Sequence, residues 1–339
     1  MRRSLALLTA LLLVAALAPP TLAGNAPEAA PAGPGTRPVI GLVTEGTLYD
    51  HGFNQAAWEG VQAGAAAIGG RAVVLVTRDP SKYVKDIQRL ARRADVVVTV
   101  GFTMVDATLA VALANPGVQF IGLDEWYENP PANLQGLLFD EAQAGYLAGI
   151  VAAWMSESGV VGAVGGVDWI APVLAYMNGY KNGATGAAYV HNYADSFASP
   201  EAGAAATSEL IAQDADVVFG VAGATNLGIF EAACEAGIWA IGVDVDQYPQ
   251  QPEFQACLLT SAEKRLAHAT SLAIQRWFTD RPGFQSGLYL NDASNGGIGL
   301  APIRNVEVPA ALQAALDEAY AGLADGTVDP CAPTLCTTP

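Results

Sequence analysis

The sequence predicts an α/β protein of two similar lobes, each built around a parallel sheet, with a ligand cleft between the lobes. The first observation is composition: 52% of the 339 residues are hydrophobic and 14% are charged, which argues for sizeable cores and against disorder. The second is the alternation of short apolar runs with amphipathic stretches, which is typical of buried parallel strands joined by crossover helices. The third is an internal repeat, which indicates two lobes of the same architecture.

The internal repeat consists of four pairs of matching segments in the same order along the chain. The pairs are 40–43 with 161–164, 58–65 with 177–184, 94–98 with 215–219, and 121–124 with 241–244. Short apolar members such as VVVTVG and FIGLD suit strands that are buried on both faces. Amphipathic stretches suit the crossover helices, and they lie at 54–66, 82–93 and 226–236.

The amino-terminal segment has the composition of a targeting sequence. Arg2 and Arg3 precede an apolar run over 5–18, and small residues follow it, so we expect a secretory signal peptide over 1–23. The alternative is an uncleaved membrane anchor, although the run is shorter than a membrane span requires. The Ala-, Pro- and Gly-rich stretch 24–37 predicts a disordered linker. No lipobox cysteine is present, and we expect export to the periplasm or the outer face of the cytoplasmic membrane.

The carboxyl-terminal third is expected to cross back between the lobes. After residue 261 the pattern predicts a helix over 262–278, a Gly- and Asn-rich stretch over 286–300 and a helix over 308–323. The predicted units are then a first lobe over 38–138 plus about 262–285, a second lobe over 139–261 plus about 286–325, and a carboxyl-terminal tail over 326–339.

The four cysteines are expected to form disulfides if the chain is exported, because disulfides persist in oxidising compartments. They allow three pairings, among which the sequence alone does not choose. We favour Cys234–Cys257, which would tie a helix to a nearby strand, and Cys331–Cys336, which would close a small loop in the tail. The alternative is four free or buried thiols.

Charge and missing motifs exclude several functions. The chain has 16 Lys and Arg against 33 Asp and Glu, so its formal charge of −17 disfavours nucleic acid and anionic lipid as partners. Zinc signatures, a P-loop, G-x-G-x-x-G and G-x-S-x-G are absent, and we expect no metal, no cofactor and no enzymatic activity. The competing interpretation is an enzyme that uses Asp124 and Asp244 as a glycosidase carboxylate pair. Their expected positions on separate lobes favour binding.

The ends of the predicted strands are the candidate site, because open α/β sheets bind ligands beyond the carboxyl ends of their strands. Polar, glycine-rich and aromatic segments follow these strands, as an orienting pocket requires. They are 44–53, 101–106, 124–127, 165–169, 195–197, 223–226 and 244–247.

The segment GFNQAAWEG at 52–60 is similar to the opening motif of the basic membrane protein (BMP) family, the substrate-binding proteins of ABC importers that include bacterial purine-nucleoside receptors. Further matches follow in order at 101–106, 120–124 (FIGLD), 144–149 (AGYLAG), 164–166, 192–197, 222–223, 241–247 (IGVDVDQ) and 260–264. The similarity covers about 38–300. It implies a type I periplasmic-binding-protein-like fold, with two Rossmann-like lobes and parallel sheets around a ligand cleft.

The resemblance implies roles for five residues. Phe53 and Phe197 match the two rings that sandwich the base, one from each lobe. Asp124 resembles the carboxylate that accepts hydrogen bonds from purine ring nitrogens, and Asp244 and Lys264 resemble the pair that holds the ribose hydroxyls. The alternative is that the rings belong to the core and that the carboxylates cap neighbouring helices.

Five further residues are candidates beside them. Gly223 would let the backbone approach the sugar closely, and Asn54 would place an amide beside the base. Glu45 stands eight positions before Phe53, where the family has an aspartate at nine, which would alter base recognition. Trp126 and Trp169 are extra aromatics expected to line the cleft, with core packing as the alternative.

The function that these residues imply is an extracytoplasmic substrate-binding protein of an ABC importer. It would capture a purine nucleoside or similar heteroaromatic ligand by hinge closure, as a monomer, and pass it to a permease in the membrane. The alternatives are a riboflavin-like ligand, a ligand-sensing receptor component, and an enzyme acting on nucleosides or sugars.

Overall fold

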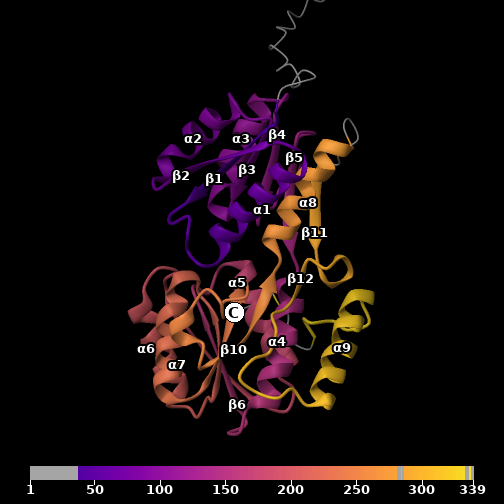
Figure 1. The fold of residues 1–339 in the computed structure, drawn as a ribbon. Helices are drawn as coiled ribbons and strands as arrows, with labels where there is room; N and C mark the ends of the chain where they lie inside the picture. The colour runs from indigo at the N-terminus through magenta and orange to yellow at the C-terminus, as the bar shows by residue number, and fades with distance from the viewer. Residues whose placement is uncertain (1–36, 281–283, 285, 333–335, 337–339) are drawn as a thin grey trace, which may run out of the picture.

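The computed structural model describes residues 37–280, 284, 286–332 and 336. The predicted signal peptide and almost all of the predicted linker lie outside these residues. The described chain forms two α/β lobes, one above the other in Figure 1, each with a six-stranded sheet.

The first lobe has the strand order β11-β5-β4-β3-β1-β2, with every pair parallel. Strand β11 (Gly287–Asn291) and helix α8 (Leu266–Thr279) come from the carboxyl-terminal third of the chain. Helices α1 and α8 pack together on one face of the sheet, and α2 and α3 pack on the other. The elements of its continuous part are β1 (Val39–Glu45), α1 (Phe53–Ala67), β2 (Arg71–Thr77), η1 (Pro80–Lys82), α2 (Tyr83–Ala91), β3 (Val96–Val100), η2 (Phe102–Met104), α3 (Val105–Ala114), β4 (Gln119–Leu123) and β5 (Leu134–Phe139).

The second lobe repeats this topology, with the order β12-β10-β9-β8-β6-β7. Only β12 runs antiparallel to its neighbour among the described strands of this sheet. Its elements are α4 (Glu141–Met155), β6 (Val160–Gly165), α5 (Ala171–Gly183), β7 (Ala188–Tyr193), α6 (Pro200–Ile211), β8 (Val217–Val221), η3 (Gly223–Thr225), α7 (Asn226–Ala236), β9 (Trp239–Asp244), η4 (Pro252–Phe254), β10 (Leu258–Lys264), η5 (Ala293–Asn295), β12 (Ile298–Leu300) and α9 (Ala310–Asp325).

The central strands form for the reason that the sequence suggests. All five residues of β3 and all five of β8 are buried, and both strands are rich in β-branched side chains, which suits strands covered on both faces. In the second lobe, α4 and α5 pack closely because each presents glycines to the other. A Cβ on Gly145 or Gly149 of α4 would collide with the backbone of α5, so larger residues would separate the helices.

The lobe boundaries in the carboxyl-terminal third differ from the prediction. Helix α8 (Leu266–Thr279) packs against α1, as expected for the first lobe. Strand β11 (Gly287–Asn291) pairs in parallel with β5, so the assignment of about 286–325 to the second lobe was wrong for the residues of this strand. Without β11, one edge of β5 would have unpaired backbone N–H and C=O groups, and β11 satisfies them. Residues 262–264, expected in the first lobe, complete β10 in the second.

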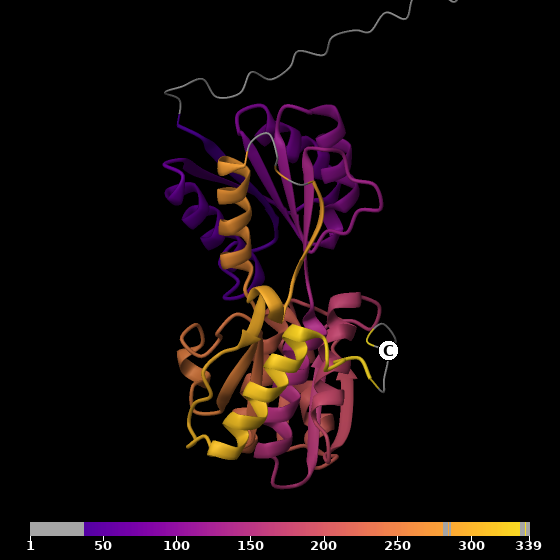
Figure 2. The same ribbon diagram turned by 90° about the vertical axis from the view of Figure 1, so that its right-hand side faces the viewer.

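Three chain crossings connect the lobes. The chain passes from β5 to α4, from β10 to α8, and from β11 to η5, as Figure 2 shows from the side. At two of the crossings the chains are tied together, because the Asp140 N–H donates to the Asn291 carbonyl oxygen at 2.9 Å. Short connections of this kind allow two lobes to rotate as bodies.

Two disulfides join the pairs that we favoured. Cys234 of α7 is bonded to Cys257, which immediately precedes β10, and Cys331 is bonded to Cys336. The first bond links a helix to the start of a strand in the second lobe. None of the helices in the described residues has the length and apolar character needed to cross a membrane.

Candidate ligand-binding cleft

A cavity of about 570 Å³ lies between the lobes, at the carboxyl ends of the central strands. This volume lies within the range of small-molecule pockets. Eight of the ten residues predicted for ligand binding line it: Glu45, Phe53, Asn54, Asp124, Phe197, Gly223, Asp244 and Lys264.

Two carboxylates occupy equivalent positions in the two lobes. Asp124 follows β4 with a φ of 56°, and Asp244 ends β9 with a φ of 66°. This left-handed conformation is uncommon for a residue other than glycine, although aspartate tolerates it better than most residues. The repeat therefore places the same side chain, on the same unusual backbone, at the end of each strand.

Lys264 is a buried cation between the lobes, with only 3% of its surface exposed. Its Nζ lies 2.6 Å from Asp124 Oδ2 and 2.7 Å from Glu141 Oε1. Nζ also lies over the ring of Phe53, 5.5 Å from the centroid. Sequence reasoning had paired Lys264 with Asp244, whereas its ion pairs in the structure are with Asp124 and Glu141.

The burial of these charges shifts their pKa values. Desolvation raises the pKa of Asp244 to about 6 and that of Glu141 to about 7, in spite of the nearby Lys264. Burial disfavours the charge of Lys264, but Asp124, Glu141 and Asp244 surround it and the pKa of Lys264 is raised. The cation is therefore held firmly charged by carboxylates.

The two carboxylates differ in what holds them. Asp244 Oδ1 accepts a hydrogen bond from the Tyr176 hydroxyl at 3.3 Å. Asp124 uses Oδ2 for Lys264, while its buried Oδ1 has no hydrogen-bond partner in the described part of the chain. A buried oxygen of this kind is costly unless a donor reaches it.

The two predicted stacking rings lie in different surroundings. Phe53 begins α1 and packs partly against the core. Phe197 lies in the loop between β7 and α6, is 38% exposed, and covers Gly166, where a Cβ would collide with the ring. Gly223 has a φ of 56°, and a Cβ there would lie 3.3 Å from the Phe197 carbonyl oxygen. The missing side chains at Gly166 and Gly223 thus leave room for Phe197 against the second lobe.

Asn54 holds the loop between β1 and α1. Its Oδ1 accepts from Thr44 Oγ1 at 2.5 Å, and its Nδ2 donates to the carbonyl oxygens of Glu45 at 3.0 Å and Thr47 at 3.1 Å. Its amide is thereby engaged with the protein. Glu45 is held as well, since its Oε2 accepts from Thr103 Oγ1 at 2.9 Å.

The two tryptophans lie outside the lining of the cavity. Trp126 is 58% exposed and Trp169 is 68% exposed, so neither is packed in the core. Trp169 meets the edge of Phe102, a lining residue, with ring centroids 6.0 Å apart and planes at 86°. The pair joins a loop of the second lobe to η2 of the first.

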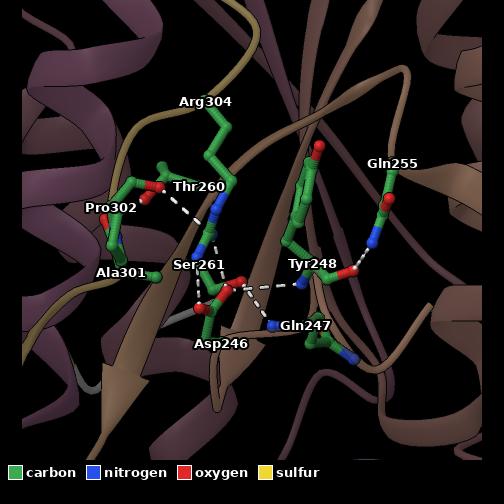
Figure 3. Close-up of polar contacts among 9 residues, drawn as sticks. All are labelled: Asp246, Gln247, Tyr248, Gln255, Thr260, Ser261, Ala301, Pro302 and Arg304. Carbon is green, nitrogen blue, oxygen red and sulfur yellow. Dashed lines mark hydrogen bonds and ion pairs between the residues drawn. The ribbon is translucent and has the colours of Figure 1, made fainter. Parts of the chain in front are cut away.

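The loop that follows Asp244 is braced from outside the cavity. Arg304 donates two hydrogen bonds to Asp246, at 2.8 and 2.6 Å, and stacks over the ring of Tyr248 (Figure 3). The Gln247 N–H donates to Ser261 Oγ at 3.1 Å. These contacts give Asp246 and Gln247 a supporting role, consistent with their absence from the lining.

Sequence reasoning assigned no individual role to four charged or aromatic residues at this site, although Asp50 and Phe102 lie within the predicted strand-end segments 44–53 and 101–106. Asp50, Phe102 and Tyr176 line the cavity, and Glu141 binds Lys264 from α4. Asp50 carried a local signal, because an aspartate just before a helix is a typical capping residue. Tyr176 and Glu141 lie within helical patterns that mark no particular side chain.

The fold and the cleft define the class of protein. The structure superposes on a solute-binding protein of an ABC transporter system from Aeropyrum pernix K1 with a TM-score of 0.75 and 22% identity, over 86% of this chain and 93% of the other. It matches a solute-binding protein from Conexibacter woesei with a TM-score of 0.71 and 26% identity, over 86% and 98% of the chains. The architecture is therefore that of a type I periplasmic binding protein.

The family follows from the sequence. Residues 37–321 match the model of the Bmp family, described as ABC transporter substrate-binding protein PnrA-like. Basic membrane protein A of Borreliella burgdorferi is 29% identical over 275 residues, which cover 77% of this chain and 78% of that protein. The chain belongs to this family of substrate-binding proteins, a class that works outside the cytoplasm and serves membrane permeases.

Proposed function

We propose that this protein captures a purine nucleoside, or a similar flat heteroaromatic compound bearing hydroxyls, and delivers it to a permease without chemical change. The proposal includes export through residues 1–23 and action as a monomer. The observation that carries it is Asp124 Oδ1, a buried and unpartnered carboxylate oxygen in the cavity that also holds Phe53 and Phe197. Such an oxygen calls for an N–H or O–H donor on the ligand.

The two lobes would close on the ligand from opposite sides. Phe53 from the first lobe and Phe197 from the second supply flat faces for an aromatic ring. Asp124 would accept from the heterocycle, and Asp244 from hydroxyls at the other end. Because these contacts come from both lobes, a ligand that makes all of them favours the closed arrangement. Lys264 fixes Asp124 in place through their ion pair.

Isothermal titration calorimetry tests this proposal directly. Adenosine and guanosine should bind, and free ribose should bind far more weakly because it lacks the aromatic ring. Phe197→Ala should lower nucleoside affinity by about tenfold, the upper end for loss of one stacking contact. Phe278→Ala, which removes an exposed ring on α8 away from the cavity, is the matched control.

The panel also separates the competing ligands. Tighter binding of riboflavin than of adenosine would favour the flavin alternative. Binding of sugars or amino acids, with no response to nucleosides or flavins, would overturn the proposal.

A further inference from the structure

The amino-terminal end of α1 lies at the cleft, because Asp50, Phe53 and Asn54 line the cavity. Resting on the proposed function, we propose that Asp50 is a specificity-determining residue that makes the cleft accept nucleosides and reject nucleotides and other anions. It does so by filling, with its own carboxylate, the place where an α/β lobe ordinarily holds a phosphate.

The place in question is the amino-terminal end of α1, directly after the first strand. In nucleotide-binding α/β lobes, phosphate sits on the backbone N–H groups at this turn, where the helix dipole favours negative charge. Here both oxygens of Asp50 occupy those donors. Oδ1 accepts from the N–H groups of Gly52 at 3.0 Å and Gln55 at 3.1 Å, and Oδ2 accepts from Asn54 at 3.0 Å.

The equivalent helix of the second lobe also has few groups at its amino-terminal end that could bind a phosphate. Helix α5 begins at Ala171, after an Ile170 cap that makes no side-chain hydrogen bond, and Pro172 in its first turn has no N–H to donate. Ile170, Pro172 and Val173 all line the cavity. One lobe therefore fills its helix terminus with a carboxylate, and the other presents an apolar turn.

The charges of the lining act in the same direction. Four carboxylates line the cavity, those of Glu45, Asp50, Asp124 and Asp244, against a single basic residue among the described lining residues, Lys264. That cation is already bonded to Asp124 and Glu141. A phosphate would therefore meet repulsion without a free cation to bind it, and repulsion is strong in a poorly solvated site.

The test measures the affinity of adenosine and of adenosine 5′-monophosphate by calorimetry for wild type and Asp50→Asn. Asparagine keeps the size and one capping oxygen but removes the charge. Wild type should prefer adenosine by at least about a hundredfold, and Asp50→Asn should narrow that ratio by about tenfold. Asp79→Asn, which changes the helix-capping carboxylate of η1 away from the cavity, should leave the ratio unchanged.

A second measurement uses no nucleoside. At constant ionic strength, inorganic phosphate in place of chloride should raise the Tm of Asp50→Gly, whose α1 amides are uncovered, but should not raise the Tm of wild type or of Asp79→Gly. Equal binding of the nucleotide and adenosine by wild type would overturn the assignment, as would an unchanged ratio in Asp50→Asn or an unresponsive Asp50→Gly. If wild type binds neither compound, the proposed function fails, and the phosphate measurement alone decides the role of Asp50.

Discussion

At the scale of single residues, the two strand-end aspartates, Asp124 and Asp244, occupy equivalent positions but have different partners. Asp124 and Asp244 share a left-handed backbone and a strand end, yet Lys264 is bonded to Asp124 and Tyr176 to Asp244. Asp244 is half-buried and has no directly bonded cation among the described residues, and desolvation raises its pKa to about 6. A ligand hydroxyl would be bound more strongly by the ionised form of Asp244, because a carboxylate accepts charge-assisted hydrogen bonds.

Asp244→Ala should reduce the affinity for adenosine by about ten- to a hundredfold, the cost of losing one partner of a charge-assisted hydrogen bond. Wild-type affinity should also fall as the pH drops below about 6, because protonation of Asp244 removes its negative charge. Lys264 keeps its other partners, so the variant should stay folded. Calorimetry from pH 5 to 8 measures both effects.

Asp106→Ala is the matched control for that substitution. Asp106 is exposed in the first turn of α3 and does not line the cavity. Its charge favours the amino-terminal end of the helix, so its loss should cost a few tenths of a kcal/mol in stability and leave binding intact. Loss of binding in Asp106→Ala, with normal binding in Asp244→Ala, would refute this assignment of the carboxylates.

At the scale of elements, the connection from β4 to β5 encloses a carboxyl group inside the first lobe. Glu125 is fully buried, and its Oε2 accepts a short hydrogen bond from the Tyr127 hydroxyl. The space for it comes from Gly122 of β4, where a Cβ would press on Glu125 and Tyr127. Desolvation raises the pKa of Glu125 to about 7.

Glu125→Gln should remove part of the pH dependence of stability. The pKa of Glu125 is higher in the folded chain than its ordinary 4.5, so the native state binds the proton more tightly. Wild-type stability therefore falls as the pH rises from about 4.5 to 7, by up to about 3 kcal/mol from this group. Urea denaturation at pH 5 and pH 8 should show a smaller fall in the free energy of unfolding for Glu125→Gln than for wild type. An equal fall in the two proteins would contradict this role of Glu125.

At the scale of the whole molecule, side-chain contacts join the lobes in addition to the chain crossings. Lys264 at the end of β10 binds Asp124 of the first lobe beside the crossings. Trp169 of the second lobe meets Phe102 of the first, and both side chains are partly exposed. A contact that forms only when the lobes are together stabilises the closed state and retards release.

Trp169→Ala should therefore raise the dissociation rate of adenosine by about three- to tenfold, the value of an edge-to-face aromatic pair. Stopped-flow measurements give this rate, and the association rate should change little. Trp126→Ala removes an equally large exposed ring that does not line the cavity. If the Trp126 and Trp169 variants release adenosine at the same rate, the ring pair does not retain the ligand.

The local and repeated features of this protein could be predicted from its sequence. Buried strands such as β3 and β8 follow from apolar runs, and the repeat placed Asp124 and Asp244 at equivalent strand ends. The amphipathic stretch 54–66 predicted α1, which begins one residue earlier, at Phe53. These features depend on residues that are neighbours along the chain, so hydrophobic periodicity and helix-end signals in the sequence predict them.

The sequence did not predict the partners of Lys264, the exposure of Trp126 and Trp169, or the sheet that β11 joins. Each of these features depends on how the two lobes and the carboxyl-terminal chain crossings are arranged in space. Lys264 lies 140 positions from Asp124 in the chain, and two carboxylates near it carried the same repeat signal. The choice between them is made by distance and burial, because Coulomb attraction in a desolvated site depends on separation in space.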